Sequence, residues 1–290
     1  MKQPDYTLAQ LRQEPHLSYS ALNTYINICQ LQYYFRYIAK AESERISAAL
    51  PFGSAFHSAL SEQAQAAKKG QLMSAEQMKE VFVTYFRSNC DTSVNVIYKK
   101  GENEDDLITT AGQMMETVTK EWCDYWNIEA VAYPFSINIL GVSLPLIGEI
   151  DMIVKEDLPF SEEPTETCLV DFKTAARMWP DGKAHRDLQA TTLIYAYEKL
   201  TGTRPTFRFD VITKTKKPAV KHFYTTRLPD DFHRLEKLVQ TACHAIDAGI
   251  FLPNETSFAC SSCPYAGSCR AWHTQSTTTT TIAPGKEVAA

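Results

Sequence analysis

The spacing of apolar residues changes near the middle of the chain. In the first half, apolar side chains recur every three to four residues, which is typical of amphipathic helices. The first predicted helix begins at Ser18 or Ser20, either of which can act as its N-cap, and it carries Cys29. The same spacing predicts three further helices, at about residues 54–68, 75–90 and 105–127.

From residue 131 onwards the apolar positions follow the pattern of strands. Two strands that meet at Gly141 predict a hairpin, and further strands alternate with helices. The predicted elements are strands at 131–140, 143–154, 167–173, 206–213 and 220–227, and helices at 184–200 and 230–248. We therefore expect an α/β protein with a helical N-terminal lobe (1–130), an α/β core with the C-terminal cysteine segment (131–273), and a disordered, threonine-rich tail (274–290).

Composition and charge narrow the class of protein. The 290 residues include 44% apolar and 22% charged residues, as in an ordinary globular protein. The chain has neither an apolar run long enough for a membrane span nor the order of a secretory signal at its start, so we expect a cytoplasmic protein without membrane association. A net charge of −5 means that any nucleic-acid site must be a local basic channel.

Carboxylates cluster on two of the predicted strands. Strand alternation places Glu149 and Asp151 on one face of the first strand, and Asp171 and Lys173 on one face of the second. If the strands are neighbours, three carboxylates and one ammonium converge, and such acids need a cation because like charges raise each other's pKa. Mg²⁺ or Mn²⁺ prefers oxygen ligands and can activate water. The alternative is an ordinary ion pair between Asp171 and Lys173 on a solvated strand.

The cysteines fall into two groups. Cys90, Cys123, Cys168 and Cys243 stand singly among apolar neighbours, so we expect them to be small core residues. Three others form a CxxCx5C motif near the C-terminus, and Cys29 precedes them by more than 200 residues. The ligands of structural zinc usually come as two local pairs, so one distant and three local thiolates favour a [4Fe-4S] cluster, with zinc as the alternative. The predicted cluster ligands are Cys29, Cys260, Cys263 and Cys269.

These motifs, in this order, resemble those of the RecB/AddB-type branch of the PD-(D/E)XK nucleases. The resemblance spans roughly residues 17–272 and rests on the helix with Cys29, Gly53-Ser54-Ala55-Phe56-His57, GEID with Asp151, DFK with Asp171 and Lys173, Gln189 and the CxxCx5C motif. It implies a restriction-endonuclease-like fold, in which a central mixed β-sheet is flanked by helices and a [4Fe-4S] cluster joins the first helix to the C-terminal segment.

The resemblance also implies a set of site residues. The metal ligands would be His57, Asp151, Asp171 and the carbonyl of Phe172, and the catalytic residues would include Lys173 and Gln189. Relatives often place a tyrosine four residues after the glutamine. Here that position is Leu193, and Tyr195 and Tyr197 follow it. Among carboxylates, Lys173 should keep its charge, which favours an electrostatic role over that of a general base.

The implied function is that of an Mg²⁺- or Mn²⁺-dependent deoxyribonuclease, an exonuclease on single-stranded or end-containing DNA in repair, recombination or foreign-DNA processing. The chain has no G-x4-GK[ST] motif, so a helicase or another repair or adaptation partner would act in trans. Relatives also form homo-oligomers. Two alternatives remain, a DNA-end-binding scaffold that does not cut and a zinc-stapled protein that is not a nuclease.

Residues that could contact DNA are scattered along the chain. Basic residues could bind the phosphate backbone, and aromatic side chains could stack on bases. The basic candidates are Arg177, Lys183, Arg186, Lys214, Lys216 and Lys217, and the aromatic candidates are Tyr19, Tyr33, Tyr34, Phe35, Tyr37 and Trp179.

Overall fold

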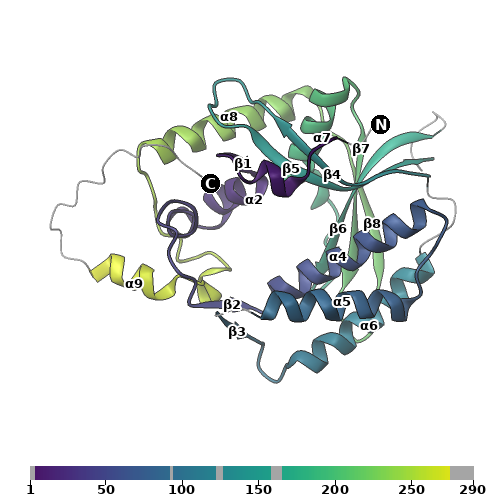
Figure 1. The fold of residues 1–290 in the computed structure, drawn as a ribbon. Coiled ribbons are helices and arrows are strands. Elements are labelled where there is room, and N and C mark those ends of the chain that lie inside the picture. Colours follow the sequence, from purple (N-terminus) through teal and green to yellow (C-terminus); the bar gives the residue numbers. More distant parts are fainter. Residues whose placement is uncertain (1–3, 92–93, 122–126, 158–164, 275–290) are drawn as a thin grey trace. The chain divides into compact units, whose positions relative to one another are not determined.

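The computed structural model describes residues 4–91, 94–121, 127–157 and 165–274, which belong to two compact units (Figure 1). The first unit contains residues 4–5, 47–133 and 149–227, and the second contains residues 6–46, 134–148 and 228–274. Cys123 and residues 275–290 of the predicted tail lie outside the described residues. The predicted division of the chain at residue 130 remains a prediction.

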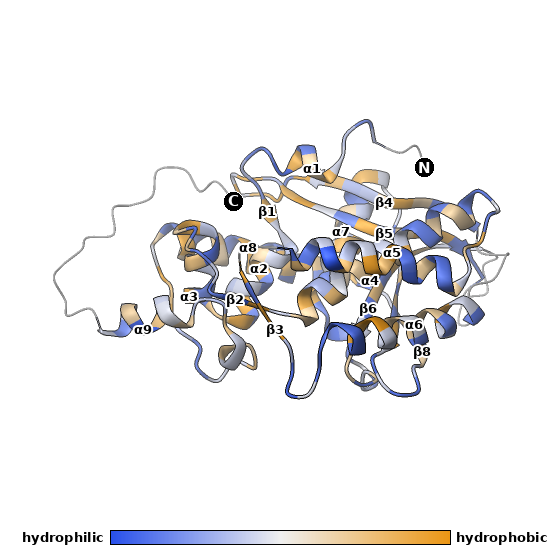
Figure 2. Ribbon diagram, turned by 60° about the horizontal axis from the view of Figure 1, so that its bottom comes forward, coloured by the Kyte–Doolittle hydropathy of each residue, from blue (hydrophilic) through white to orange (hydrophobic). Residues whose placement is uncertain are grey.

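Three long helices form one layer of the first unit. They are α4 (Ala49–Lys68), α5 (Ala75–Cys90) and α6 (Glu104–Glu121). Figure 2 shows both hydrophilic and hydrophobic stretches along α5 and α6, as expected of amphipathic helices. Their apolar faces enclose four fully buried phenylalanine rings, those of Phe52, Phe56, Phe82 and Phe86.

The predicted helices of this layer are confirmed, with corrections at two ends. Helix α4 begins five residues before the predicted start at residue 54. The predicted end of the third helix at residue 127 is wrong, because Asn127 already begins a strand. Ser74 begins α5 at the predicted place, since its side chain accepts a hydrogen bond from the Gln77 amide and Gln77 caps it in return.

A mixed β-sheet forms the second layer of the first unit, apart from residues 134–137 of β4 and 146–148 of β5, which belong to the second unit. Strand β5 is antiparallel to β6, β6 is parallel to β7, β7 is antiparallel to β8, and β4 pairs with β5. Helix α7 joins the two parallel strands, as a crossover connection requires. The bounds are β4 (Asn127–Ile137), β5 (Leu146–Glu156), β6 (Glu166–Ala175), α7 (Leu188–Thr201), β7 (Thr206–Thr213) and β8 (Val220–Thr225), with β3 (Asn95–Ile97) and the short 3-10 helix η3 (Ala184–Arg186) outside the sheet. The predicted α/β fold with a central mixed sheet flanked by helices is confirmed.

Alternation along β6 separates the core from the candidate site. Val170 and Phe172 pack into the core that the sheet shares with α4, α5 and α6. Asp171 and Lys173 point to the other face, because successive side chains in a strand alternate. In the register of the parallel pair, Asp171 lies opposite Phe209 of β7. The sheet therefore holds both charged residues on the face opposite to the core that it shares with these three helices.

The second unit is built from short elements and one long helix. They are α1 (Leu8–Leu11), β1 (Leu17–Ser18), α2 (Tyr19–Asn23), the π-helix η1 (Thr24–Ile28), α3 (Gln30–Tyr33), the π-helix η2 (Tyr34–Ile38), α8 (Pro229–Asp247), the 3-10 helix η4 (Cys260–Ser262) and α9 (Ala266–Thr274). Strand β2 (Arg45–Ser47) lies where the chain leaves this unit, and β1 pairs in parallel with the first residues of β5. In the described part of the chain, no helix is both long enough and apolar enough to span a membrane.

The prediction of one helix through Cys29 is wrong. Ser18 does cap α2, but Cys29 is extended, with φ −166° and ψ 121°, and it divides the segment. The Cys29 amide donates to the Thr24 carbonyl at 2.8 Å, which closes a π-turn. Its thiol then accepts a hydrogen bond from the Gln32 amide at 3.4 Å. Cys29 thus ends one helical segment and caps the next.

Gly148 of the GEID motif lies against an aromatic ring. A Cβ atom at this position would lie 2.5 Å from the Phe135 ring, so Gly148→Ala is expected to lower the free energy of unfolding by about 1–3 kcal/mol in urea titrations. Gly53→Ala is the control, because its Cβ would meet only the Thr174 hydroxyl, at 3.8 Å, and alanine suits a helix interior. Equal losses in both variants would contradict the assigned contact.

Candidate active site

A histidine and two aspartates come together in the first unit. His57 lies on α4, and its Nδ1 atom is 3.3 Å from Oδ2 of Asp151 on β5. The same carboxylate oxygen accepts a hydrogen bond from the Phe172 amide at 3.0 Å, which ties it to β6 next to Asp171. The structure therefore brings together the four predicted metal ligands, His57, Asp151, Asp171 and Phe172.

Asp171 is held by a glutamine and a lysine. Its side chain is 2% exposed, and Gln189 Nε2 donates to Oδ1 at 2.6 Å. The Lys173 ammonium forms an ion pair with Oδ2, which is buried and accepts no hydrogen bond of regular geometry among the described residues. A buried carboxylate oxygen that accepts no regular hydrogen bond is chemically suited to a hard divalent ion, which would have to displace the ammonium.

The start of α7 positions Gln189. Asp187 is the N-cap of this helix and accepts a hydrogen bond from the Gln189 amide at 2.8 Å. The predicted helix start at residue 184 is wrong, because residues 184–186 form η3 and the cap follows it. Buried Arg227 fixes this junction by donating to the carbonyls of Ala184 and Asp187. Gln189 is therefore in the first turn of a well-anchored helix.

Tyr195 and Tyr197, which follow Gln189, each have a polar partner of their own. Leu193 occupies the position of the family tyrosine and is buried in the core. Tyr197 makes a hydrogen bond with Thr167, and the Lys199 ammonium lies 5.1 Å from the ring centre of buried Tyr195. Neither contact is with Asp171 or Asp151.

The pKa values of the two aspartates are shifted in opposite directions. Burial raises the pKa of Asp171 to about 6, although Lys173 opposes this and nearby Asp151 adds to it. Burial would also raise the pKa of Asp151, but His57, Lys173 and the Phe172 amide outweigh it and hold that pKa below its usual value. Asp171 is therefore the carboxylate that would gain more from a bound cation.

Lys173 and His57 are favoured in their charged forms. Burial alone would lower the pKa of the Lys173 ammonium, but Asp171 and Asp151 raise it above its ordinary value. For His57, burial is likewise outweighed by Asp151, so its pKa is raised. The predicted electrostatic role of Lys173 agrees with these directions. Glu149, the third predicted carboxylate, is partly exposed.

The four predicted cluster cysteines line one pocket of the second unit. Cys29, Cys260, Cys263 and Cys269 are free thiols around a cavity of about 590 Å³. Burial raises the pKa of Cys263 and of Cys269, and the neighbouring thiols raise each of them further. The cysteine-bearing loop is held to the N-terminal segment, because Leu31 donates to the Leu252 carbonyl at 3.1 Å. These residues fit a thiolate-bound metal centre in type and in number.

Neither set of residues forms a ready metal cage. Within the described ranges, no group of three or more His, Cys, Asp or Glu side chains is arranged to hold a metal ion. At the carboxylate site, His57 and Lys173 lie against the oxygens of Asp151 and Asp171 that an ion would take. A divalent ion there would compete with these two cationic groups.

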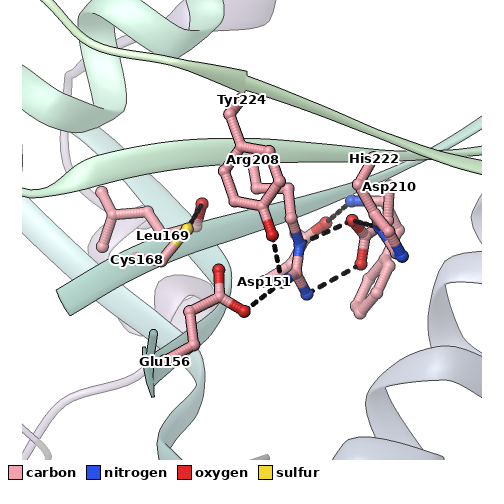
Figure 3. A network of polar contacts seen from close by, with 9 residues as sticks. Asp151, Glu156, Cys168, Leu169, Arg208, Asp210, His222 and Tyr224 are labelled. Carbon is pink, nitrogen blue, oxygen red and sulfur yellow. Dashed lines mark hydrogen bonds and ion pairs between the residues drawn. The ribbon is translucent and has the colours of Figure 1, made fainter. Parts of the chain in front are cut away.

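A buried polar network behind β6 was not predicted. Figure 3 shows Arg208 between Glu156 and Asp210, and its guanidinium donates to both oxygens of Asp210 at 2.7 and 3.1 Å. It also forms an ion pair with Glu156, and His222 Nδ1 lies 2.5 Å from Asp210 Oδ1. Asp210 lies opposite Phe172 in the β6–β7 register. The network therefore lies on the face of the sheet opposite to that of Asp171.

The sequence holds one signal of this network. Arg208 and Asp210 are two residues apart in the otherwise apolar segment TFRFDVIT, so both point to the same face of a buried strand. Two charges on one buried face require partners.

The single cysteines differ in burial. Cys168 is buried, as predicted, whereas Cys90 and Cys243 are only partly buried.

Comparison with known proteins gives a consistent result. A family model described as the PD-(D/E)XK nuclease superfamily matches residues 16–270. The fold is similar to that of a candidate exonuclease from Eubacterium rectale, with 14% identity, coverage of 90% of this chain and 93% of that one, and a TM-score of 0.50. A structure described as SSO0001 has 12% identity, coverage of 87% and 95%, and a TM-score of 0.34. No curated protein matches the chain.

Proposed function

The chain belongs to the PD-(D/E)XK nuclease superfamily, whose members hydrolyse DNA with divalent metals such as Mg²⁺ or Mn²⁺, and we propose that it is an exonuclease of the RecB/AddB-like branch. Its substrate would be single-stranded DNA or DNA with a free end, in repair, recombination or foreign-DNA processing. The observation that carries the proposal is the convergence of His57, Asp151, Asp171, Lys173 and Gln189 on one side of the family fold.

Each of these residues has a distinct task in the proposed reaction. His57, Asp151, Asp171 and the Phe172 carbonyl would hold the divalent ion, which when bound supplies Lewis-acid activation of water. Lys173 keeps its proton and stabilises the charge that develops on the phosphoryl oxygens. Gln189 fixes the orientation of Asp171 through Oδ1, so Oδ2, which pairs with Lys173, would be the oxygen to bind an ion.

The activity is tested with end-labelled DNA. Single- and double-stranded oligonucleotides labelled at the 5′ or 3′ end are incubated with Mg²⁺ or Mn²⁺, and the product lengths give the polarity. Progressive shortening that stops on chelation of the metal is expected. Tight binding of DNA ends without any cutting would contradict the proposal and favour a scaffold that holds ends for a partner, such as a helicase acting in trans.

We also propose that Cys29, Cys260, Cys263 and Cys269 bind a structural [4Fe-4S] cluster. Their shared pocket and free thiols support this, and the separation of one ligand from the other three favours iron–sulfur over zinc. The cluster would join the turn at Cys29 to η4 and α9, all within the second unit.

Replacement of a cluster ligand has an expected spectroscopic result. Cys260→Ala should remove most bound iron and the visible absorption of the purified protein, and should lower its Tm, because metal binding adds to folding free energy. Cys90→Ala, at a partly buried cysteine of α5, is the matched control and should keep the bound iron and the visible absorption. Iron-free wild-type protein with stoichiometric zinc would overturn the iron assignment.

A further inference from the structure

The loop between β6 and α7 places an indole ring beside the candidate active site. The Trp179 ring centre lies 5.0 Å from that of Phe209 and 6.0 Å from that of Phe223. Phe209 is opposite Asp171 in the β6–β7 register, and Phe223 is opposite Phe209 in the β7–β8 register. A row of aromatic rings therefore runs across the sheet from Asp171 and is covered by Trp179.

This aromatic row is continuous with the proposed catalytic lysine. The Lys173 ammonium lies 5.6 Å from the ring centre of Phe209, on which Trp179 packs. The Phe209 ring therefore contacts both the indole and the Lys173 ammonium, which would face the phosphoryl oxygens. Trp179 is only partly buried, so its surface remains within reach of a substrate strand.

A tight turn places a lysine over the indole. The Lys183 amide donates to the Pro180 carbonyl at 3.3 Å, and Gly182 has the positive φ, 79°, that this turn needs. The turn brings the Lys183 ammonium to 3.7 Å from the ring centre of Trp179. Lys183 is exposed as a whole, but partial desolvation of its ammonium, together with the Lys173 charge, lowers its pKa, although Asp187 opposes this. The Lys183 side chain can therefore swing away from the ring so that its ammonium binds an anion.

Two contacts join this loop to strand β8. Asp181 forms an ion pair with Lys221 of β8, and His185 Nδ1 lies 3.0 Å from the Thr225 hydroxyl. A fixed aromatic ring with a movable cation above it can receive one nucleotide, because the ring offers a stacking surface and the cation can bind the adjoining phosphate.

We propose that Trp179 is a stacking platform for one unpaired base of the DNA strand, and that Lys183 leaves the indole to bind the phosphate of that nucleotide. This inference rests on the proposed function of the same site. A stacked base contributes more than a cation over an exposed ring, so the base displaces the ammonium. Paired bases in a duplex have no free face to offer, and the platform therefore favours single strands or frayed ends.

The test compares DNA with and without bases. Fluorescence anisotropy measures the Kd of the full chain, in the slow-cutting Lys173→Ala background with Mg²⁺, for a labelled single-stranded oligonucleotide and for an abasic strand of equal length. Trp179→Leu keeps apolar contact with the two phenylalanines but removes the stacking surface. It should weaken binding of the normal strand by about 5- to 100-fold and leave the abasic strand unchanged. Trp179→Phe should restore most of the loss.

Two further variants separate stacking from charge. Lys183→Ala should weaken binding of the normal strand and reduce its salt dependence by about one counterion, and it should affect the abasic strand less, because no base displaces the ammonium from the indole. Trp272→Leu, at an exposed tryptophan of α9 in the second unit, should leave the ratio of the Kd values for the abasic and the normal strand unchanged. An unchanged ratio in Trp179→Leu would overturn the platform, even if that variant binds both strands less tightly.

The remaining outcomes are also decisive. A full chain that binds no DNA at all would overturn the proposed function and the platform together, whereas DNA binding with an unaffected ratio overturns only the platform. If Trp179→Leu does not fold, photocrosslinking of the wild type to an iodouracil-containing strand decides instead. A crosslink mapped to Trp179 supports the platform, and crosslinks confined to other residues overturn it.

Discussion

Lys173→Ala is expected to reduce the rate of DNA cleavage by about 10²- to 10³-fold, with DNA binding largely retained. The Lys173 ammonium lies against Asp171 and is kept charged by two carboxylates, so it is placed to offset charge that develops on the phosphate during the reaction. Alanine removes that charge without adding bulk. The measurement is single-turnover cleavage of end-labelled DNA at saturating Mg²⁺.

Lys79→Ala is a suitable control for this variant. Lys79 belongs to the same unit and forms an ion pair, but its partner Glu76 lies three residues away on the same helix, α5. This variant should therefore cleave DNA at close to the wild-type rate. Equal rates for Lys173→Ala and the wild type would place the chemistry elsewhere. A loss that is repeated in Lys79→Ala would indicate a general effect of charge on binding.

Arg208→Met is expected to lower the free energy of unfolding by about 3–5 kcal/mol. Arg208 is 2% exposed, and its guanidinium is the shared partner of Asp210 and Glu156. Methionine fills a similar volume but leaves both carboxylates buried without that cation. Urea unfolding followed by circular dichroism measures the loss.

Arg204→Met provides the matched comparison. Arg204 also binds a carboxylate, Glu198, but both side chains are about one-third exposed, so the pair should contribute no more than about 1 kcal/mol. A loss in Arg208→Met as small as that in Arg204→Met would show that water reaches the buried network. Adding Asp210→Asn to Arg208→Met should recover part of the loss, because it removes one of the unpaired charges.

The effect of Arg208→Met should also depend on pH. In the wild type, burial would raise the pKa of Asp210, but Arg208 and His222 outweigh it and lower that pKa. The ionised Asp210 therefore stabilises the fold above its unfolded pKa of about 4, and this contribution is lost as the pH falls through the lower folded value. Without Arg208 the folded pKa of Asp210 rises, so protonation in acid relieves the variant. The difference in stability should shrink as the pH falls through the raised folded pKa of the variant, and it should shrink further below about pH 4, where the wild type loses its own contribution.

Strand alternation in the sequence was enough to place the carboxylate site. The acids of GEID and DFK come from strands that are neighbours in the structure, and the side chains of Asp151, Asp171 and Lys173 meet as the alternation requires. The position of His57 was implied by family resemblance alone, since a histidine in an amphipathic helix gives no local sign of its partner. The local sequence pattern predicts the face of the sheet on which a side chain lies, and the pairing of the strands then determines which residues it contacts.

Features that depend on distant partners could not be predicted. The break at Cys29 is stabilised by residues more than 200 positions away, where Asn254 donates to the Ile28 carbonyl and the Leu252 amide donates to Gln30. Helical periodicity continues through this segment, so the sequence gives no sign of the break. The network of Arg208 likewise draws its partners from three strands, and no local pattern connects Glu156 with His222.

The division of the chain into two units has a consequence for its synthesis. A ribosome that has made residues 1–227 has produced every residue of the first unit, including His57, Asp171 and Gln189. The second unit then still lacks α8 and three of its four pocket cysteines, which follow Arg227. Domains generally fold as units during translation. The unit that carries the proposed active site can therefore fold first, and any metal centre on the cysteines must be loaded after translation of the last pocket residues.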